Sequence, residues 1–151
     1  GADRYNGFNL LVGEKDDLYW TSNRSDTIMR IPEGLHGISN HLLDTPWPKV
    51  TRGKDELARL LDRRKGPPLD KLFGLLKDGA LAPDATLPQT GVPLEWERTL
   101  SSIFITSPTY GTRSSTLLLI DQEDHVTFVD RTFNGHPDPV AATEFEFFIE
   151  T

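Results

Sequence analysis

The apolar residues of this chain change their spacing along the sequence, and that change limits the folds that it can adopt. At both ends, short apolar runs such as Phe8 to Gly13 and Thr116 to Ile120 alternate with clusters of turn residues, a pattern typical of antiparallel hairpins. Only the middle of the chain, between Pro48 and Lys77, carries apolar residues at helical spacing. This order predicts an α+β fold, with antiparallel sheets layered with helices.

Prolines, glycines and acidic turns between the apolar runs set the bounds of the expected elements. Strands are predicted at Phe8–Gly13, Leu18–Thr21, Thr27–Ile31, Leu35–Ser39, Thr99–Thr106, Thr116–Ile120, Val126–Val129 and Glu144–Ile149. Helices are predicted from Pro48 to about Arg64 and at Leu69–Lys77, and residues Leu81 to Pro93 are expected to form a loop. A chain of 151 residues suits a single domain or the C-terminal part of a longer one.

Charge and cysteine content argue against several classes of function. The net charge is −7, from 16 basic and 23 acidic residues, which disfavours a nucleic-acid binder because such binding depends on neutralising phosphates. The chain has no cysteine, so disulfides, thiolate metal sites and a cysteine nucleophile are excluded within it. No apolar run approaches the roughly 20 residues that span a bilayer.

Six stretches, spread in order over nearly the whole chain, together match one protein family. They are Tyr5–Gly13, Tyr19–Arg24, Gly34–Asn40, Leu43–Val50, Leu100–Ile105 and Tyr110–Thr116. Single pieces, such as Gly-Thr-Arg-Ser-Ser, are weak signals, but the combination is specific. On these stretches the chain resembles the Asn-Arg-Asp-Glu (NRDE) family, of the transport and Golgi organisation protein 2 type.

The chain departs from the family pattern at its start. Full members open with Met-Cys and carry the Asn-Arg-Asp-Glu tetrapeptide soon after, and neither is present in this sequence. The similar Asn23-Arg24-Ser25-Asp26 lies at a different place. The resemblance therefore implies that the chain is the C-terminal portion, and that an absent N-terminal segment is its partner and carries any catalysis.

The resemblance also implies a fold and a function. The fold is like that of the N-terminal-nucleophile (Ntn) hydrolases, an αββα sandwich of two antiparallel sheets with helices outside. The proposed family roles are haem handling or trafficking and lipid or acyl-thioester homeostasis, in the cytoplasm or in mitochondria. In Ntn hydrolases the thiol or hydroxyl of the first residue attacks an amide. Gly1 has no such side chain, so this chain alone is not expected to be an enzyme.

Arg113 is the centre of one candidate ligand-binding site. The hydroxyl residues Thr112, Ser114 and Ser115 flank it directly before a very apolar run, and Tyr110 lies close in sequence. A cation and several hydroxyls at the mouth of a strand can bind a carboxylate or a phosphate. The alternative is that these are ordinary strand and turn residues.

A second group of candidates surrounds Asn40, which we expect to share one polar cleft with Arg113. As a neutral donor, Asn40 can stabilise an oxyanion or bind a ligand carbonyl, or it can simply close a turn. His36 and His41 can each ligate a metal or haem iron, but a structural role is preferred because no carboxylate or cysteine pattern supports a metal site. Trp47 can cap the core or line a cleft, and core packing is preferred. Asn23-Arg24 can contact a ligand or form a turn with an exposed arginine, and the turn is preferred.

Three functions stay open. The first, which we prefer, is a ligand-binding or trafficking protein whose Arg113 pairs the acid group of haem or of another small molecule. The second is an Ntn-type amide hydrolase whose nucleophile lies in the absent segment. The third is a structural half that needs that segment to fold.

Overall fold

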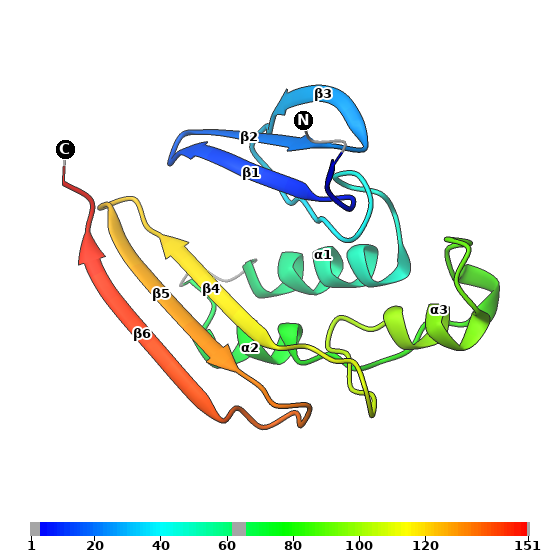
Figure 1. Cartoon of the computed structure of the whole chain (residues 1–151). Coiled ribbons are helices and arrows are strands. Elements are labelled where there is room, and N and C mark those ends of the chain that lie inside the picture. Colours follow the sequence, from blue (N-terminus) through cyan, green and yellow to red (C-terminus); the bar gives the residue numbers. More distant parts are fainter. Residues whose placement is uncertain (1–3, 62–65, 151) are drawn as a thin grey trace.

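The computed structural model describes residues 4–61 and 66–150, and it confirms the α+β expectation. Its described residues form two antiparallel three-stranded sheets, in the orders β1-β2-β3 and β4-β5-β6, and three α-helices (Figure 1). The elements are β1 Asn9–Glu14, β2 Asp17–Ser22, β3 Ser25–Arg30, α1 Pro48–Leu61, α2 Leu69–Leu76, α3 Leu94–Leu100, β4 Ser114–Ile120, β5 His125–Thr132 and β6 Ala141–Phe148. The closer likeness to the Ntn hydrolases stays a prediction.

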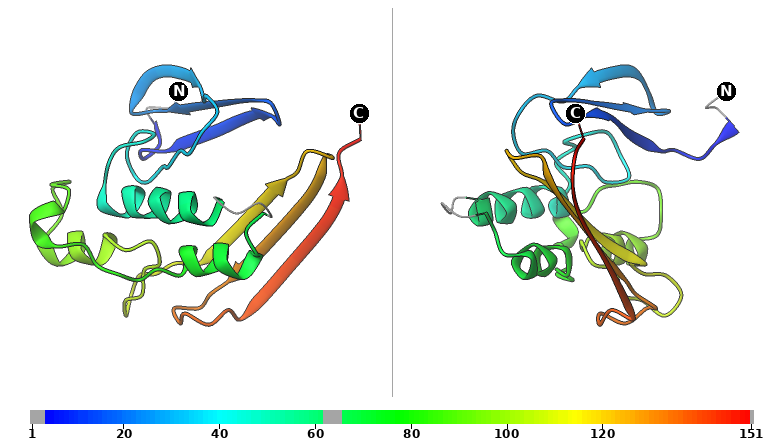
Figure 2. Two further views of the ribbon diagram at one scale, coloured as in Figure 1. Left: turned by 180° about the vertical axis from the view of Figure 1, so that it is seen from behind. Right: turned by 90° about the vertical axis from the view of Figure 1, so that its left-hand side faces the viewer.

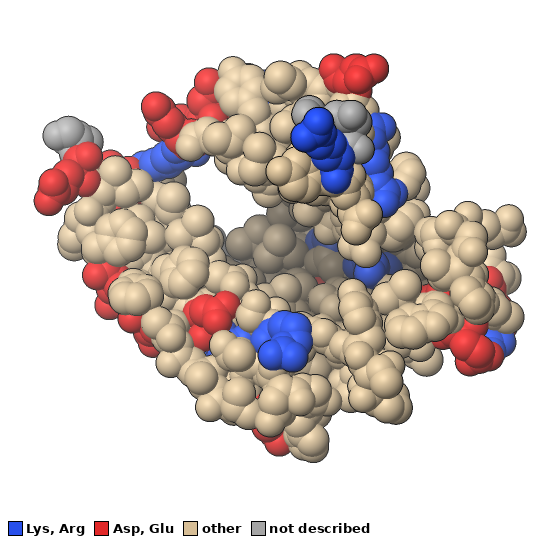
Figure 3. Space-filling view, in the orientation of Figure 1, with Lys and Arg blue, Asp and Glu red and all other residues tan. Residues whose placement is uncertain are grey.

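The helices lie between the two sheets in sequence and link them in space. Helix α1 lies between the β1–β3 sheet and α2, and α2 packs against the β4–β6 sheet (Figures 1 and 2). The two sheets meet where their turns approach each other, through an ion pair between Lys15 and Asp124. Beyond this contact an opening separates the sheets (Figure 3).

Local turn chemistry accounts for the hairpins. Glu14 pairs with Asp17, and Ser22 pairs with Ser25, so each hairpin of the first sheet closes with a two-residue loop. In the turn between β4 and β5, the Asp121 carboxylate accepts hydrogen bonds from backbone N–H groups at 2.8 and 3.0 Å. This side-chain-closed turn is the structure that an acidic cluster between two apolar runs predicts.

Each helix begins at or just after a proline. Pro48 is the first residue of α1, and Pro68 and Pro93 immediately precede α2 and α3. Proline suits a helix start because its fixed φ is already helical and its missing N–H has no partner there. The predicted helix from Pro48 is confirmed to Leu61, and its expected end near Arg64 lies outside the described residues.

The strand predicted at Leu35–Ser39 is wrong. This segment is irregular and its backbone groups bond elsewhere. The Gly37 N–H donates to the Asp44 carboxylate at 3.0 Å, and the Gly37 carbonyl accepts from the Asp44 N–H at 2.8 Å. A Cβ at Gly37 would lie 2.8 Å from Val50 of α1, so the glycine lets this segment approach the helix closely.

The strand predicted at Thr99–Thr106 is also wrong. Helix α3 continues to Leu100, and Ser101 then donates its hydroxyl to the Arg98 carbonyl at 2.6 Å. Two residues further on, the N–H groups of Ile103 and Phe104 both donate to the Asp78 carbonyl. The apolar residues after α3 therefore turn into the core, where Phe104 packs edge-to-face on Phe133 with ring centroids 4.8 Å apart.

The two faces of the β4–β6 sheet have different neighbours. Leu117 pairs with Val129 and Ser115 with Arg131 on the face that meets α2, where the Arg131 guanidinium lies 3.7 Å from the centre of the Phe73 ring. We call this the covered face. The opposite face, the open face, carries apolar rows: Leu118, Phe128 and Phe145 form one, and Ile120, Val126 and Phe147 form the next.

Candidate functional site

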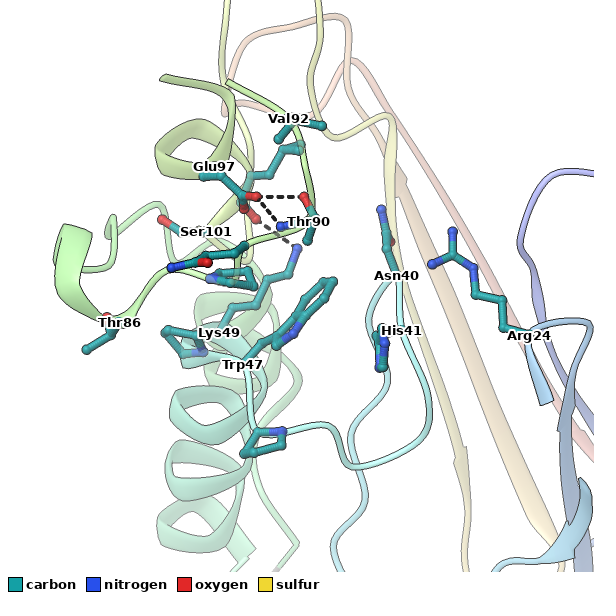
Figure 4. Close-up of a pocket in the computed structure, with 15 residues that line it drawn as sticks. Arg24, Asn40, His41, Trp47, Lys49, Thr86, Thr90, Val92, Glu97 and Ser101 are labelled. Atoms are coloured by element: carbon teal, nitrogen blue, oxygen red, sulfur yellow. Dashed lines mark hydrogen bonds between the residues drawn. The ribbon is translucent and has the colours of Figure 1, made fainter. Parts of the chain in front are cut away.

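A polar cavity of about 720 Å³ lies where the start of α1 meets α3 (Figure 4). Its walls come from five parts of the chain: the β2–β3 turn, the segment before α1, the first turn of α1, the loop that leads into α3, and α3 with its C-terminal end. The residues used below are Arg24, Asn40, His41, Trp47, Lys49, Thr90 and Glu97. A volume of this size suits a small organic ligand.

Lys49 extends from the first turn of α1 into this cavity (Figure 4). Its amine donates to the Leu100 carbonyl at 2.8 Å, and no carboxylate within 4.0 Å pairs with it among the described residues. Burial lowers the pKa of the Lys49 amine, because a low-dielectric environment disfavours the charged form. An anion entering the cavity would restore the favourable environment of the cation.

Glu97 of α3 lies in the wall of the same cavity and is buried. One carboxylate oxygen accepts from both the N–H and the hydroxyl of Thr90, at 2.7 and 2.6 Å. These bonds, drawn in Figure 4, fix the loop against α3. Glu97 therefore bonds to a protein loop, while no carboxylate of the described residues pairs with Lys49.

Trp47 and His41 form an aromatic wall on the other side of Lys49. Their rings are tilted at 41° with centroids 5.7 Å apart. His41 Nδ1 lies 2.9 Å from the Thr45 hydroxyl, which itself donates to the Leu42 carbonyl. The hydroxyl proton is therefore used, and Nδ1 must donate. In the neutral imidazole, this assignment leaves His41 Nε2 as the acceptor.

Asn9 of β1 holds the segment that carries Asn40 and His41. Its side-chain amide donates to the carbonyls of Ser39 and His41, at 3.2 and 2.9 Å, and its oxygen accepts from the Trp20 indole at 3.0 Å. The buried Trp20 thereby orients Asn9. Through these hydrogen bonds, the first sheet positions Asn40 at the cavity.

Arg24, from the β2–β3 turn, faces Asn40 across the mouth of the cavity (Figure 4). A Cβ at Gly7 would lie 1.9 Å from Arg24 Nε, so only glycine allows the guanidinium to lie against this part of the backbone. Arg24 and Lys49 thus present two cations to one cavity.

Asp44 organises the turn between the first sheet and α1. Its carboxylate contacts His36 Nδ1 at 2.6 Å, Lys54 Nζ at 2.7 Å and the Gly37 N–H. Burial alone would raise the pKa of Asp44, but the hydrogen bonds from Lys54, His36 and Gly37 outweigh it and lower the pKa to about 2. Asp44 is therefore a carboxylate that favours its charged form and holds the segment before α1 against the helix.

The structure brings only part of the predicted site together. Asn40 lines the polar cavity and a neighbouring, mostly apolar cavity of about 450 Å³. His36 lines the apolar cavity, but both of its ring nitrogens have protein partners, Asp44 and the Pro32 carbonyl. These contacts are those of a histidine with a structural role, which the sequence analysis prefers for His36. Within the described residues, no group of three or more His, Asp or Glu residues is placed to hold a metal.

The other predicted residues lie elsewhere. Arg113 is exposed and lines neither cavity that Asn40 lines. Thr112 accepts from the Ile105 N–H at 2.9 Å, Ser114 is exposed, Ser115 is buried in β4, and Tyr110 packs edge-on against Trp96 at 5.9 Å. Ligand binding by the residues around Arg113 stays a prediction.

Sequence reasoning missed Lys49 and Glu97. For Arg24 it preferred an exposed turn residue to a ligand contact, and for Trp47 it preferred core packing to a cleft wall. A signal existed for the α3 residue: Pro93 followed by Glu95 and Glu97, with Arg98 later, is typical of a helix start and end. For Lys49 no local signal distinguishes it from a solvated helix lysine, because its partial burial depends on Leu100, far along the chain.

Comparison with known sequences shows the family of the chain. The family model described as Transport and Golgi organisation 2 matches residues 1–135. The chain belongs to this family. Within the Transport and Golgi organisation 2 family, the Transport and Golgi organization protein 2 homolog of Bos taurus is 34% identical over 164 aligned residues, which cover 97% of this chain and 58% of that protein. The Homo sapiens homolog is 32% identical over 142 residues, covering 85% of this chain and 51% of that protein.

The chain therefore spans a little over half the length of these relatives. None of the helices in the described part of this family member has the length and apolar character needed to cross a bilayer.

Proposed function

We propose that this family member contributes a ligand-binding site to a trafficking protein, and that the ligand is a small molecule with an acid group and an apolar body. The polar cavity supports this proposal, and the observation that carries it is the half-buried Lys49 amine without a carboxylate partner among the described residues. A ligand carboxylate or phosphate would supply the missing negative charge.

Two ligand classes fit the family's proposed roles. For haem, Lys49 and Arg24 would pair the propionates, Trp47 would contact the porphyrin face, and the acceptor His41 Nε2 would be available for iron. For an acyl-thioester such as a long-chain acyl-coenzyme A, the same cations would pair the phosphates. The proposal places the protein in the cytoplasm or in mitochondria.

The test is binding of haem and of a long-chain acyl-coenzyme A to the wild-type chain and to two lysine variants. Lys49→Met keeps most of the side-chain volume and removes the charge. We expect it to weaken binding about tenfold or more, since a charge-assisted hydrogen bond contributes roughly 1.5–3 kcal/mol. Lys71→Met, at an exposed position on α2, is the matched control and should bind as the wild type does.

Absorption and calorimetry separate the two ligands. A shift of the haem Soret band that His41→Ala abolishes would identify haem, and heat released only with the acyl compound would identify the lipid class. If the wild-type chain binds neither, or if both lysine variants bind equally, the cavity is not the site.

A further inference from the structure

The chain exposes much more surface than a monomer of its mass does. Its accessible surface is 10756 Å², whereas the usual scaling predicts about 7,700 Å² for a folded protein of 17.0 kDa. The difference is about 3,000 Å². Among the described residues no large side chain is less than 2% exposed. The helices and sheets thus form with only part of the burial expected for this length.

Part of the exposed apolar surface lies on the open face of the β4–β6 sheet. Leu118, Phe145 and Phe147 are 60%, 56% and 52% exposed, although they stand in adjacent rows. Phe128 and Phe145 contact each other with ring centroids 6.2 Å apart. Val126, between Ile120 and Phe147 in the next row, is only 3% exposed, so the rows pack sideways into a continuous apolar surface.

Charge is confined to the margins of this surface. Glu144 and Glu146 of β6 pair in register with Val129 and Thr127, and so point to the covered face. Asp130 is the first charged residue on the open face, where it accepts a hydrogen bond from Thr116 at 2.7 Å. In Figure 3 the surface over these strands is mostly uncharged. Soluble monomers rarely leave such an apolar patch uncovered.

We infer that the open face packs against the part of the family polypeptide that lies outside the match with this chain. That part is large, because the match covers 58% of the bovine relative and 51% of the human one. The proposed occupant is an apolar β segment, which would lie across Leu118, Phe145 and Phe147 and exclude water from them. The inference concerns a surface separate from the ligand cavity.

The surface that the whole chain leaves exposed argues for a large occupant. A standard interface buries about 800 Å² on each partner, whereas the whole chain exposes about 3,000 Å² more than the usual scaling predicts. A polypeptide that completes the domain would bury surface on the scale of an obligate interface.

The experiment uses a photo-crosslinking residue, p-benzoylphenylalanine, placed at Phe145 or at Phe148. Both are exposed phenylalanines of β6, but Phe148 lies on the other face, where it contacts His125 at 4.9 Å. The chain is co-expressed with the residues of the bovine relative outside the match. We expect a one-to-one complex, crosslinked at least fivefold more from position 145 than from position 148.

A second measurement does not depend on crosslinking. Phe145→Asp should weaken the complex at least tenfold relative to Phe148→Asp, with circular dichroism confirming that both chains keep their strand content. Equal crosslinking from both positions, crosslinks between two copies of this chain, no complex, or equal affinity of the two variants would each overturn the inference.

Discussion

The two faces of the β4–β6 sheet share the same strands, but within the described part of the chain only the covered face has a helix over it. On the covered face, Val129 is buried and Arg131 lies over the Phe73 ring. On the open face, Phe145 has no helix partner and is more than half exposed. An apolar alternation on both faces of a strand therefore predicts two layers of neighbours, of which this chain supplies one.

The largest effect is expected when one phenylalanine is removed from each side of the sheet and the losses of unfolding free energy are compared. Phe73→Ala removes a buried ring and should lower the free energy of unfolding by about 3–5 kcal/mol. Phe145→Ala should change it by about 0.5 kcal/mol or less in the isolated chain. Urea unfolding followed by circular dichroism measures both, and similar losses would mean that the open face is already packed.

Acid should remove the contribution of Asp44 to stability. The pKa of Asp44 is about 2 in the folded chain, below its ordinary value of 3.8. Its contribution to stability is thus complete above about pH 4 and is lost as the pH falls toward 2. Asp44→Asn should flatten the acid limb of a stability–pH curve. An acid limb as steep in this variant as in the wild type would contradict this view of Asp44.

A smaller contrast concerns Arg131. Its stacking on Phe73 contributes about 0.5–1 kcal/mol by the usual strength of partly exposed cation–π contacts, so Arg131→Ala should lower thermal stability slightly. Thr143→Ala, in the row next to Phe145 on the open face, should have a still smaller effect. Differential scanning calorimetry can resolve the two, provided the buffer is the same.

The smallest effect is expected at the contact between the sheets. Lys15→Met removes the ion pair with Asp124, but both groups are exposed and salt screens such pairs. The melting temperature should stay within error of the wild type at physiological salt. A clear drop would show that this contact, and not the helices, sets the relation of the two sheets.

The hairpins could be predicted because their signals are local. Acidic or glycine-containing turns between apolar runs specify pairing within a few residues, and β1, β2, β4 and β5 lie where those signals predict. The segment Leu35–Ser39 has a similar composition but is not a strand, because the Asp44 side chain takes its backbone bonds. Such competition by a tertiary contact cannot be seen in the segment itself.

The candidate site was predicted less well, for a related reason. Asn40 lies at a cavity as expected, because polar residues in loops often do. Lys49 and Glu97 meet there only because α3 folds back toward the start of α1. A strand at Thr99–Thr106, which the sequence pattern predicts, does not include this return of the chain. Without a predicted helix α3, the residues that this helix and its preceding loop bring to the cavity could not be identified from the sequence.

The placement of Trp47 beside His41 gives the protein a built-in optical reporter. An indole in the cavity wall changes its emission when a ligand displaces water from it, and an absorbing ligand such as a porphyrin would quench it by energy transfer. Trp20 is buried in the first sheet and Trp96 is 41% exposed, so Trp47→Phe is the control that identifies the emission of Trp47. Occupancy can thus be followed by intrinsic fluorescence without attaching any dye.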